Sequence, residues 1–231
     1  AARAEQKATA RDLLLLAAGA EEGAKPASVD PPAPRSITFN FIRASALRDA
    51  NSRKILQGET GLPRFQDIRQ RCPDWIRRLE VNELQACGHE LVGKCLIVSH
   101  CWEDPANPDL KGVQLARIVE HLEKNPAIEY VWYDFWCLAQ GTERAAADER
   151  EFKSHLAHVN WLYLGASVLL IVDMSTLGRF WTQYEAWLSM QSATLSGLQP
   201  ASQADLRATT VCIHNAEDDM EGRKLSKLWS T

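Results

Sequence analysis

The chain has 231 residues, with 26 Lys and Arg against 30 Asp and Glu, which gives a formal net charge of −4 at pH 7. This balance argues against a nucleic-acid-binding protein that relies on bulk positive charge. The apolar fraction of 45% is ordinary for a globular protein and allows a hydrophobic core. The longest apolar runs have the length of a strand, so no transmembrane segment is predicted.

Six cysteines are spread along the chain, which is too sparse for a disulfide scaffold of this length. Reduced thiols and an intracellular location are therefore predicted, either cytoplasmic or organellar after processing, since the chain begins with Ala1 rather than Met. The pairs Cys87/His89 and Cys212/His214 do not match a standard zinc site, so no metal is predicted.

Three regions follow one another along the chain. Residues 1–35 combine an Ala- and Leu-rich helix near residues 10–18 with a proline-rich linker, and a free helix of this kind suits a docking arm. Residues 36–90 form a lead-in segment, with a short alternating strand around Phe39 and a helix over 43–57. Its stretch 62–76 is basic and amphipathic, and we interpret the arginines as a solvated helix face.

Residues 91–231 show a regular alternation of strands and helices. Strands that alternate with helices predict parallel pairing through right-handed crossovers, and hence an open α/β sheet flanked by helices. The density of tryptophans between residues 102 and 187 places the packed core there. The expected strands cover 94–100, 128–134, 167–173 and 209–214, and the expected helices cover 113–122, 149–164 and the region around Trp181.

Polar and aromatic side chains follow three of these strands. The first strand ends in residues 99–104 (SHCWED), the second in 134–141 (DFWCLAQG), and the third ends at Asp173 before a helix that carries Glu185. In open α/β sheets, ligands bind in the crevice beyond the carboxyl ends of the strands. The sequence therefore predicts that these residues meet at one edge of the sheet.

Glu185 is an acid in an aromatic neighbourhood. Helical spacing places Trp181, Glu185 and Leu188 on one face, so the carboxylate shares its stripe with an indole and a leucine. Two interpretations stay open: a surface acid that flanks the core, or an active-site group with a raised pKa.

The order of these motifs resembles TIR-like domains related to fungal heterokaryon-incompatibility (HET) domains, in particular the tryptophan-rich versions found in algae. The resemblance covers roughly residues 91–191, and the loop after Asp134 is closer to the HET pattern than to the usual TIR loop. It implies a TIR- or flavodoxin-like α/β fold. Many TIR domains cleave NAD between nicotinamide and ribose, and the helix glutamate of that family corresponds to Glu185.

The resemblance assigns roles to the clustered residues. Glu185 would be the catalytic carboxylate, which holds the ribose and stabilises developing positive charge without any bound cofactor, with NAD as the substrate. The expected substrate-binding residues are His100, Trp102, Asp134, Trp136 and Trp181. Simpler roles remain open: Asp134 as a helix cap or loop-orienting residue, His100 as a hydrogen-bonded core residue, and the tryptophans as core.

The sequence thus leads to two hypotheses. The first is an intracellular TIR/HET-like domain that releases nicotinamide from NAD in signalling or defence, with self-association implied by the resemblance. The second is a non-enzymatic interaction module or structural subunit that docks into a larger assembly through the N-terminal helix. An open cleft beside Glu185 favours catalysis, whereas a filled site or covered strand ends favours the second hypothesis.

Overall fold

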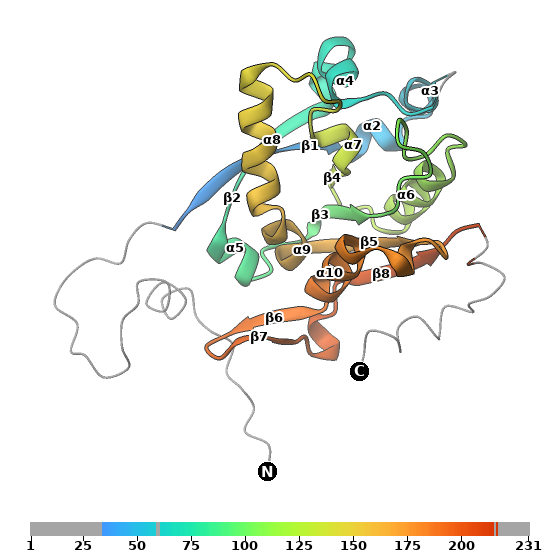
Figure 1. Cartoon of the computed structure of the whole chain (residues 1–231). Helices are drawn as coiled ribbons and strands as arrows, with labels where there is room; N and C mark the ends of the chain where they lie inside the picture. Colours follow the sequence, from blue (N-terminus) through green and yellow to red (C-terminus); the bar gives the residue numbers. More distant parts are fainter. Residues whose placement is uncertain (1–33, 59–60, 215, 217–231) are drawn as a thin grey trace.

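The computed structural model describes residues 34–58, 61–214 and 216 (Figure 1). The helix predicted near residues 10–18 and nearly all of the proline-rich linker lie outside these residues, so the helical extension stays a prediction. Within the described ranges, every helix is too short or too polar to span a bilayer.

A mixed sheet of six strands forms the centre of the fold, in the order β2-β1-β4-β3-β5-β8. Four neighbouring strands, β4, β3, β5 and β8, run parallel, while β1 is antiparallel to both β2 and β4. The prediction of a mainly parallel α/β sheet with flanking helices is confirmed. The strands span Ser36–Arg43 (β1), Ile76–Asn82 (β2), Leu91–Ser99 (β3), Tyr130–Trp132 (β4), Ala166–Val172 (β5) and Ala208–Cys212 (β8).

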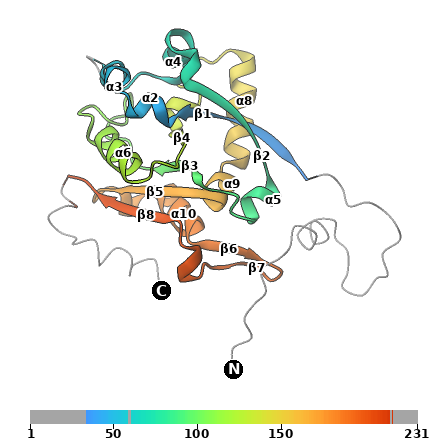
Figure 2. The ribbon, with the colours of Figure 1, turned by 180° about the vertical axis from the view of Figure 1, so that it is seen from behind.

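Helices cover both faces of this sheet. In Figure 1, α8, α9 and α10 lie in front of the strands, and Figure 2 shows α2 and α6 on the opposite face. A two-stranded hairpin, β6 (Gln191–Thr194) with β7 (Gly197–Pro200), follows α10. The helices are α2 (Ala44–Arg48), α3 (Ala50–Gln57), α4 (Phe65–Arg71), α5 (Glu83–Cys87), α6 (Val113–Lys124), α7 (Asp134–Cys137), α8 (Ala146–His158), α9 (Asn160–Gly165) and α10 (Phe180–Ser189).

The lead-in segment belongs to the central sheet. Its strand β1 pairs with β2 along seven residues and with β4 through Ile42 and Arg43. Phe39 and Phe41 on β1 are fully buried, so this segment supplies part of the core. The single helix expected over 43–57 is two helices, because the Asp49 carboxylate accepts a hydrogen bond from the Ser52 amide and starts α3.

The strand order indicates where on the sheet a ligand-binding crevice is expected. The chain passes from β3 to β4 on one side and then to β5 on the other side of β3. Such a reversal between β3 and β5 is the topological switch point at which doubly wound sheets bind ligands, beyond the carboxyl ends of the strands. Ser99, the last residue of β3, lies at this point.

The tryptophans divide between core and surface. Trp132 and Trp136 are 2% and 0% exposed and pack within the core, as the sequence predicts. Trp181 and Trp187 on α10 are 71% and 43% exposed, so the expectation of a core role for them is wrong. Helical spacing alone did not distinguish the inner face of α10, which carries Leu188, from the outer one.

Gly165 at the end of α9 allows close packing against α5. A Cβ at this position would lie 2.6 Å from the Cα atom of Ala86. We expect Gly165→Ala to lower the free energy of unfolding by about 1–3 kcal/mol, measured by urea denaturation. Gly178→Ala is the matched control, because a Cβ there has no neighbour within 4 Å. Equal stabilities of the two variants would contradict the close-packing explanation.

Candidate functional site at the carboxyl ends of the strands

Glu185 lies at the switch point of the sheet. The Ser99 hydroxyl at the end of β3 donates a hydrogen bond of 2.6 Å to Glu185 Oε2 on α10. Among the described residues, no Lys or Arg forms an ion pair with this carboxylate. The hypothesis of a surface acid held in a salt bridge therefore has no support from the geometry.

The environment of Glu185 favours its protonated form. Burial is the largest effect and raises the pKa of Glu185 from 4.5 to about 7, against the opposing hydrogen bonds from Ser99 and Tyr163. Tyr163 is almost fully buried on α9, and burial together with the negative charge of Glu185 keeps the pKa of its phenol well above 10. Tyr163 therefore remains a hydrogen-bond donor. Near neutral pH, Glu185 exchanges its proton readily, which suits a group that acts in chemistry.

Asp134 at the start of α7 is held by two side chains from the end of β3. His100 Nε2 lies 2.9 Å from Asp134 Oδ1, and the Trp102 indole donates a 3.0 Å hydrogen bond to Oδ2. Burial opposes ionisation of Asp134, but the charge and hydrogen bond of His100 and the Trp102 hydrogen bond outweigh it, so its pKa is lowered. Asp134 is thus an ionised residue that orients the loop after β3.

The His100 ring is fixed from several directions. It stacks on Tyr133 with ring centroids 4.1 Å apart, and the Tyr133 hydroxyl donates to Gln114 Oε1 at 2.9 Å. His100 Nδ1 is buried and has no hydrogen-bond partner among the described atoms. His100 directly follows Ser99, the residue that contacts Glu185, so the His100–Asp134 pair lies next to the Ser99–Glu185 contact.

The structure brings together Glu185, His100, Asp134 and Trp102, but it separates the other two tryptophans from them. Trp136 is completely buried and packs against Tyr133, so it offers no free face to a ligand. Trp181 lies on the outer face of α10, whereas Glu185 points inward to Ser99. Neither indole lines the Glu185 site in this structure.

Sequence reasoning did not assign two residues that contact Glu185. Ser99 stood within the first motif, and its position as the last residue of a strand was the available signal. Tyr163 lies near the end of the helix predicted over 149–164, and nothing in its local sequence indicated that it faces Glu185. Only the packing of α9 beside α10 reveals this contact.

Metal ligands do not gather near the site. Within the described ranges, no group of three or more His, Cys, Asp or Glu side chains is placed to hold a metal ion. All six cysteines are free thiols, and burial raises the pKa of Cys137 to about 12, which removes it as a nucleophile at neutral pH.

Comparisons with known proteins add nothing to this geometry. No protein-family model, curated protein or solved structure matches the chain. Function is therefore inferred from the site itself and from the order of the sequence motifs.

The raised pKa of Glu185 predicts a stability change with a definite sign. The folded protein holds the Glu185 proton more tightly than the unfolded chain, so this residue costs stability as the pH rises from 4.5 through about 7. We expect the free energy of unfolding of Glu185→Gln, taken relative to that of wild type, to increase by about 2 kcal/mol as the pH rises from about 5 to about 8. The measurement is urea denaturation, and the expected value is reduced because the side chain is partly exposed.

The control for this measurement is Glu80→Gln, which removes an exposed carboxylate on β2. It reports the general effect of one lost negative charge on the same protein. A Glu185→Gln variant whose stability follows wild type in parallel across this pH range would show that Glu185 ionises as an ordinary surface acid.

Proposed function

We propose that this chain is a TIR-like domain that cleaves NAD and releases nicotinamide, with Glu185 as the essential carboxylate. The observation that carries the proposal is a partly buried carboxylate at the switch point between β3 and β5, without a cationic partner among the described residues. The strand order agrees with the flavodoxin-like arrangement, in which the same point binds a ligand. The sequence resemblance supplies the reaction.

The chemistry needs a negative charge more than it needs an acid. Nicotinamide is already cationic in NAD, so the bond between its nitrogen and ribose C1′ breaks with the electron pair leaving on nicotinamide. The ribose then carries developing positive charge, which an ionised Glu185 stabilises, and water adds at C1′ and loses a proton to solvent. ADP-ribose and nicotinamide are the products.

His100, Asp134 and Trp102 position the surrounding loop in this proposal. The ionised Asp134 fixes both the imidazole and the indole, so the loop after β3 is held near Glu185 at little further entropic cost on binding. Trp102 is partly exposed and is the indole of this cluster that a nicotinamide ring can reach. Trp136 would support it only indirectly, through the core.

The test is to incubate the purified protein with NAD and to follow nicotinamide release. We expect turnover in wild type and a loss of at least about 100-fold in Glu185→Gln, because an amide cannot supply the negative charge. The kcat/KM value should rise with pH to a plateau with a midpoint at about 7, where free Glu185 ionises. The midpoint for kcat should be lower, because the bound nicotinamide cation favours the carboxylate.

Two control variants sharpen this assay. Glu80→Gln should keep wild-type turnover, since Glu80 lies on β2 away from the switch point. Ser99→Ala should move the kcat/KM midpoint upward, because the Ser99 hydrogen bond lowers the pKa of Glu185. Absence of nicotinamide release, or turnover unchanged by Glu185→Gln, would refute the proposal.

A second candidate function, an interaction module, is favoured by the outer face of α10. Four aromatic side chains are exposed there: Phe180 (73%), Trp181 (71%), Tyr184 (37%) and Trp187 (43%). Together they present roughly 500 Å² of aromatic surface, in the range of functional patches on monomers. The helix carries no other charged side chain than the inward Glu185, so a second, identical aromatic face is a chemically matched partner.

Self-association through α10 has a direct test in sedimentation velocity. The expected result is a monomer–dimer equilibrium in wild type that Trp181→Ser weakens by about tenfold or more, since an exposed tryptophan at an interface typically contributes most of the affinity. Leu206→Ser is the control, because Leu206 is 46% exposed but lies outside α10. A wild-type protein that stays monomeric at high concentration would rule out this dimer.

A further inference from the structure

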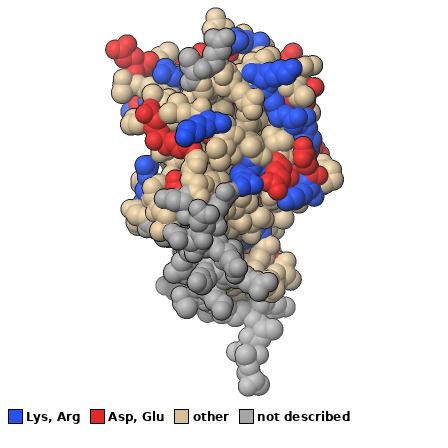
Figure 3. Space-filling view, turned by 90° about the vertical axis from the view of Figure 1, so that its right-hand side faces the viewer, with Lys and Arg blue, Asp and Glu red and all other residues tan. Residues whose placement is uncertain are grey.

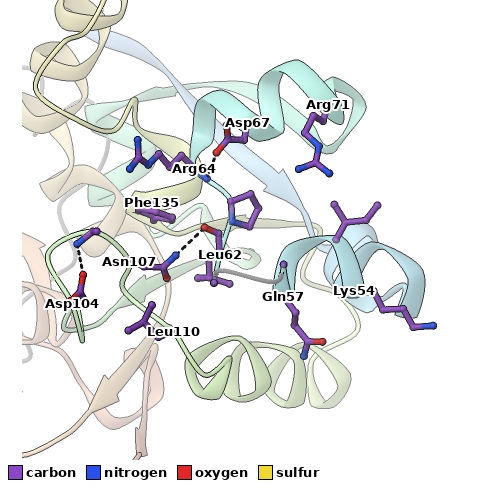
Figure 4. Close-up of a pocket in the computed structure, with 15 residues that line it drawn as sticks. Lys54, Gln57, Leu62, Arg64, Asp67, Arg71, Asp104, Asn107, Leu110 and Phe135 are labelled. Atoms are coloured by element: carbon purple, nitrogen blue, oxygen red, sulfur yellow. Dashed lines mark hydrogen bonds between the residues drawn. The ribbon is translucent and has the colours of Figure 1, made fainter.

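A large pocket lies beside the Glu185 site and is built mainly by the lead-in segment. Its volume is about 920 Å³, within the range of small-molecule sites. One wall comes from the end of α3, the next from α4 and the turn before it, and a third from the loop after β3. Figure 4 shows Phe135 at the inner end, between the side chain of Arg64 and the Asn107 loop.

The pocket is next to the clustered site residues without containing them. Phe135 directly follows Asp134, and the Trp102 ring packs edge-on against Phe135 with centroids 5.3 Å apart. Glu185 is not among the residues that line this pocket. The pocket is therefore a recess separate from the Glu185 site, and the packing of Phe135 against Trp102 connects the two.

Three cations line this recess. Lys54, Arg64 and Arg71 form no ion pair with any described residue, whereas the adjacent Arg53 and Arg69 pair with Glu123 and Asp148. The lining also contains two acids, Asp67 and Asp104, which accept hydrogen bonds from the backbone amides of Arg64 and Ala106.

Apolar side chains form the inner part of the recess. Leu62 and Phe135 are almost fully buried, and Leu110 at the opposite side is 53% exposed. In Figure 4, Arg64 reaches over Phe135, while Arg71 and Lys54 stand at the outer rim on α4 and α3. A ligand that fits this arrangement has a flat apolar group to contact Leu110 and negative charge for the basic rim.

The walls are fixed by specific contacts. The buried Asn107 side chain donates to Leu62 O at 3.1 Å and accepts from the Asp109 amide at 3.1 Å, which joins the lead-in to the loop after β3. Gly61 has a positive φ of 101°, and a Cβ there would lie 2.5 Å from Asn107 Nδ2. The recess is thus preformed, which lowers the entropic cost of binding.

From these contacts we infer that the pocket binds a nucleotide: a phosphorylated small molecule whose ring rests on the exposed side chain of Leu110 and whose phosphates meet Arg64 and Arg71. This binding does not require NAD cleavage and is open to test with Glu185 removed. The lead-in arginines, which the sequence suggested to be a solvated face, then divide by role: Arg69 anchors α4 to Asp148, and its two neighbours face the recess.

The ligand is a small molecule rather than a nucleic acid. Figure 3 looks onto the edge at which the parallel strands end, and it shows Lys and Arg interspersed with Asp and Glu around a neutral centre. A polynucleotide needs a continuous basic surface that neutralises several phosphates at once. Here the recess offers Lys54, Arg64 and Arg71 alongside Asp67 and Asp104, which suits one small anion rather than a polymer.

The experiment is isothermal titration calorimetry of the whole chain with ADP, inorganic pyrophosphate and adenosine. We expect a dissociation constant for ADP below about 1 mM, with both fragments at least about tenfold weaker, because each satisfies only one part of the recess. Arg71→Gln should weaken ADP binding about tenfold through loss of a charge-assisted hydrogen bond. Arg77→Gln, at an exposed position on β2, is the matched control and should bind ADP as wild type does.

Each alternative result contradicts a defined part of the inference. No heat with ADP at about 5 mM, well above the expected dissociation constant, would overturn it. Equal affinity for ADP and pyrophosphate would show a plain anion site, and binding unchanged by Arg71→Gln would place ADP elsewhere. ADP titrated into Glu185→Gln should bind as to wild type, which separates this result from the outcome of the nicotinamide assay.

Discussion

The hydrogen bond between Ser99 and Glu185 connects the two parts of the chain on which the site depends. Ser99 ends the central parallel strand, and Glu185 lies on the helix that follows the next strand in the sheet. The strand order reverses between these two strands, and in doubly wound sheets this is the position at which ligands bind. The position of every other site residue follows from this junction: His100 and Trp102 extend from Ser99, and Tyr163 approaches from the helix before β5.

Two acids near this junction have opposite environments. Asp134 receives hydrogen bonds from His100 and Trp102, which favour its ionised form, while Glu185 receives hydrogen bonds from the neutral hydroxyls of Ser99 and Tyr163, and its burial raises its pKa. Such a separation of pKa values between neighbouring carboxyl groups is a common way to assign them different roles. Here it assigns Asp134 to positioning and leaves Glu185 as the group whose charge is available to a ligand.

The sequence was sufficient for the sheet of residues 91–212, because buried parallel strands and amphipathic helices have distinct apolar periods. It also placed Glu185, Asp134 and His100 at one edge, since strand ends of a parallel sheet meet there. The role of the lead-in segment could not be predicted from the sequence, because the antiparallel pairing of β1 with β4 is a tertiary contact that has no local sequence pattern.

The orientation of α10 could not be predicted from the sequence either. Phe180, Trp181, Tyr184 and Trp187 have the residue types of a core, yet α10 turns them outward and buries Ala186 and Leu188 instead. Which face of a helix meets the sheet depends on the geometry of its connections. Composition alone did not contain that information.

The pairing of β1 with β4 also has a consequence for how the chain reaches this fold. Ile42 can pair with Val131 only after the chain has been synthesised as far as residue 131. Until then, β1 and β2 present an unpaired edge together with the apolar side chains of Phe39 and Phe41. Pairing between such distant segments raises the contact order and slows folding, and an open edge attracts other strands in the meantime. The segment that completes the core is thus the one most exposed to misassembly during synthesis.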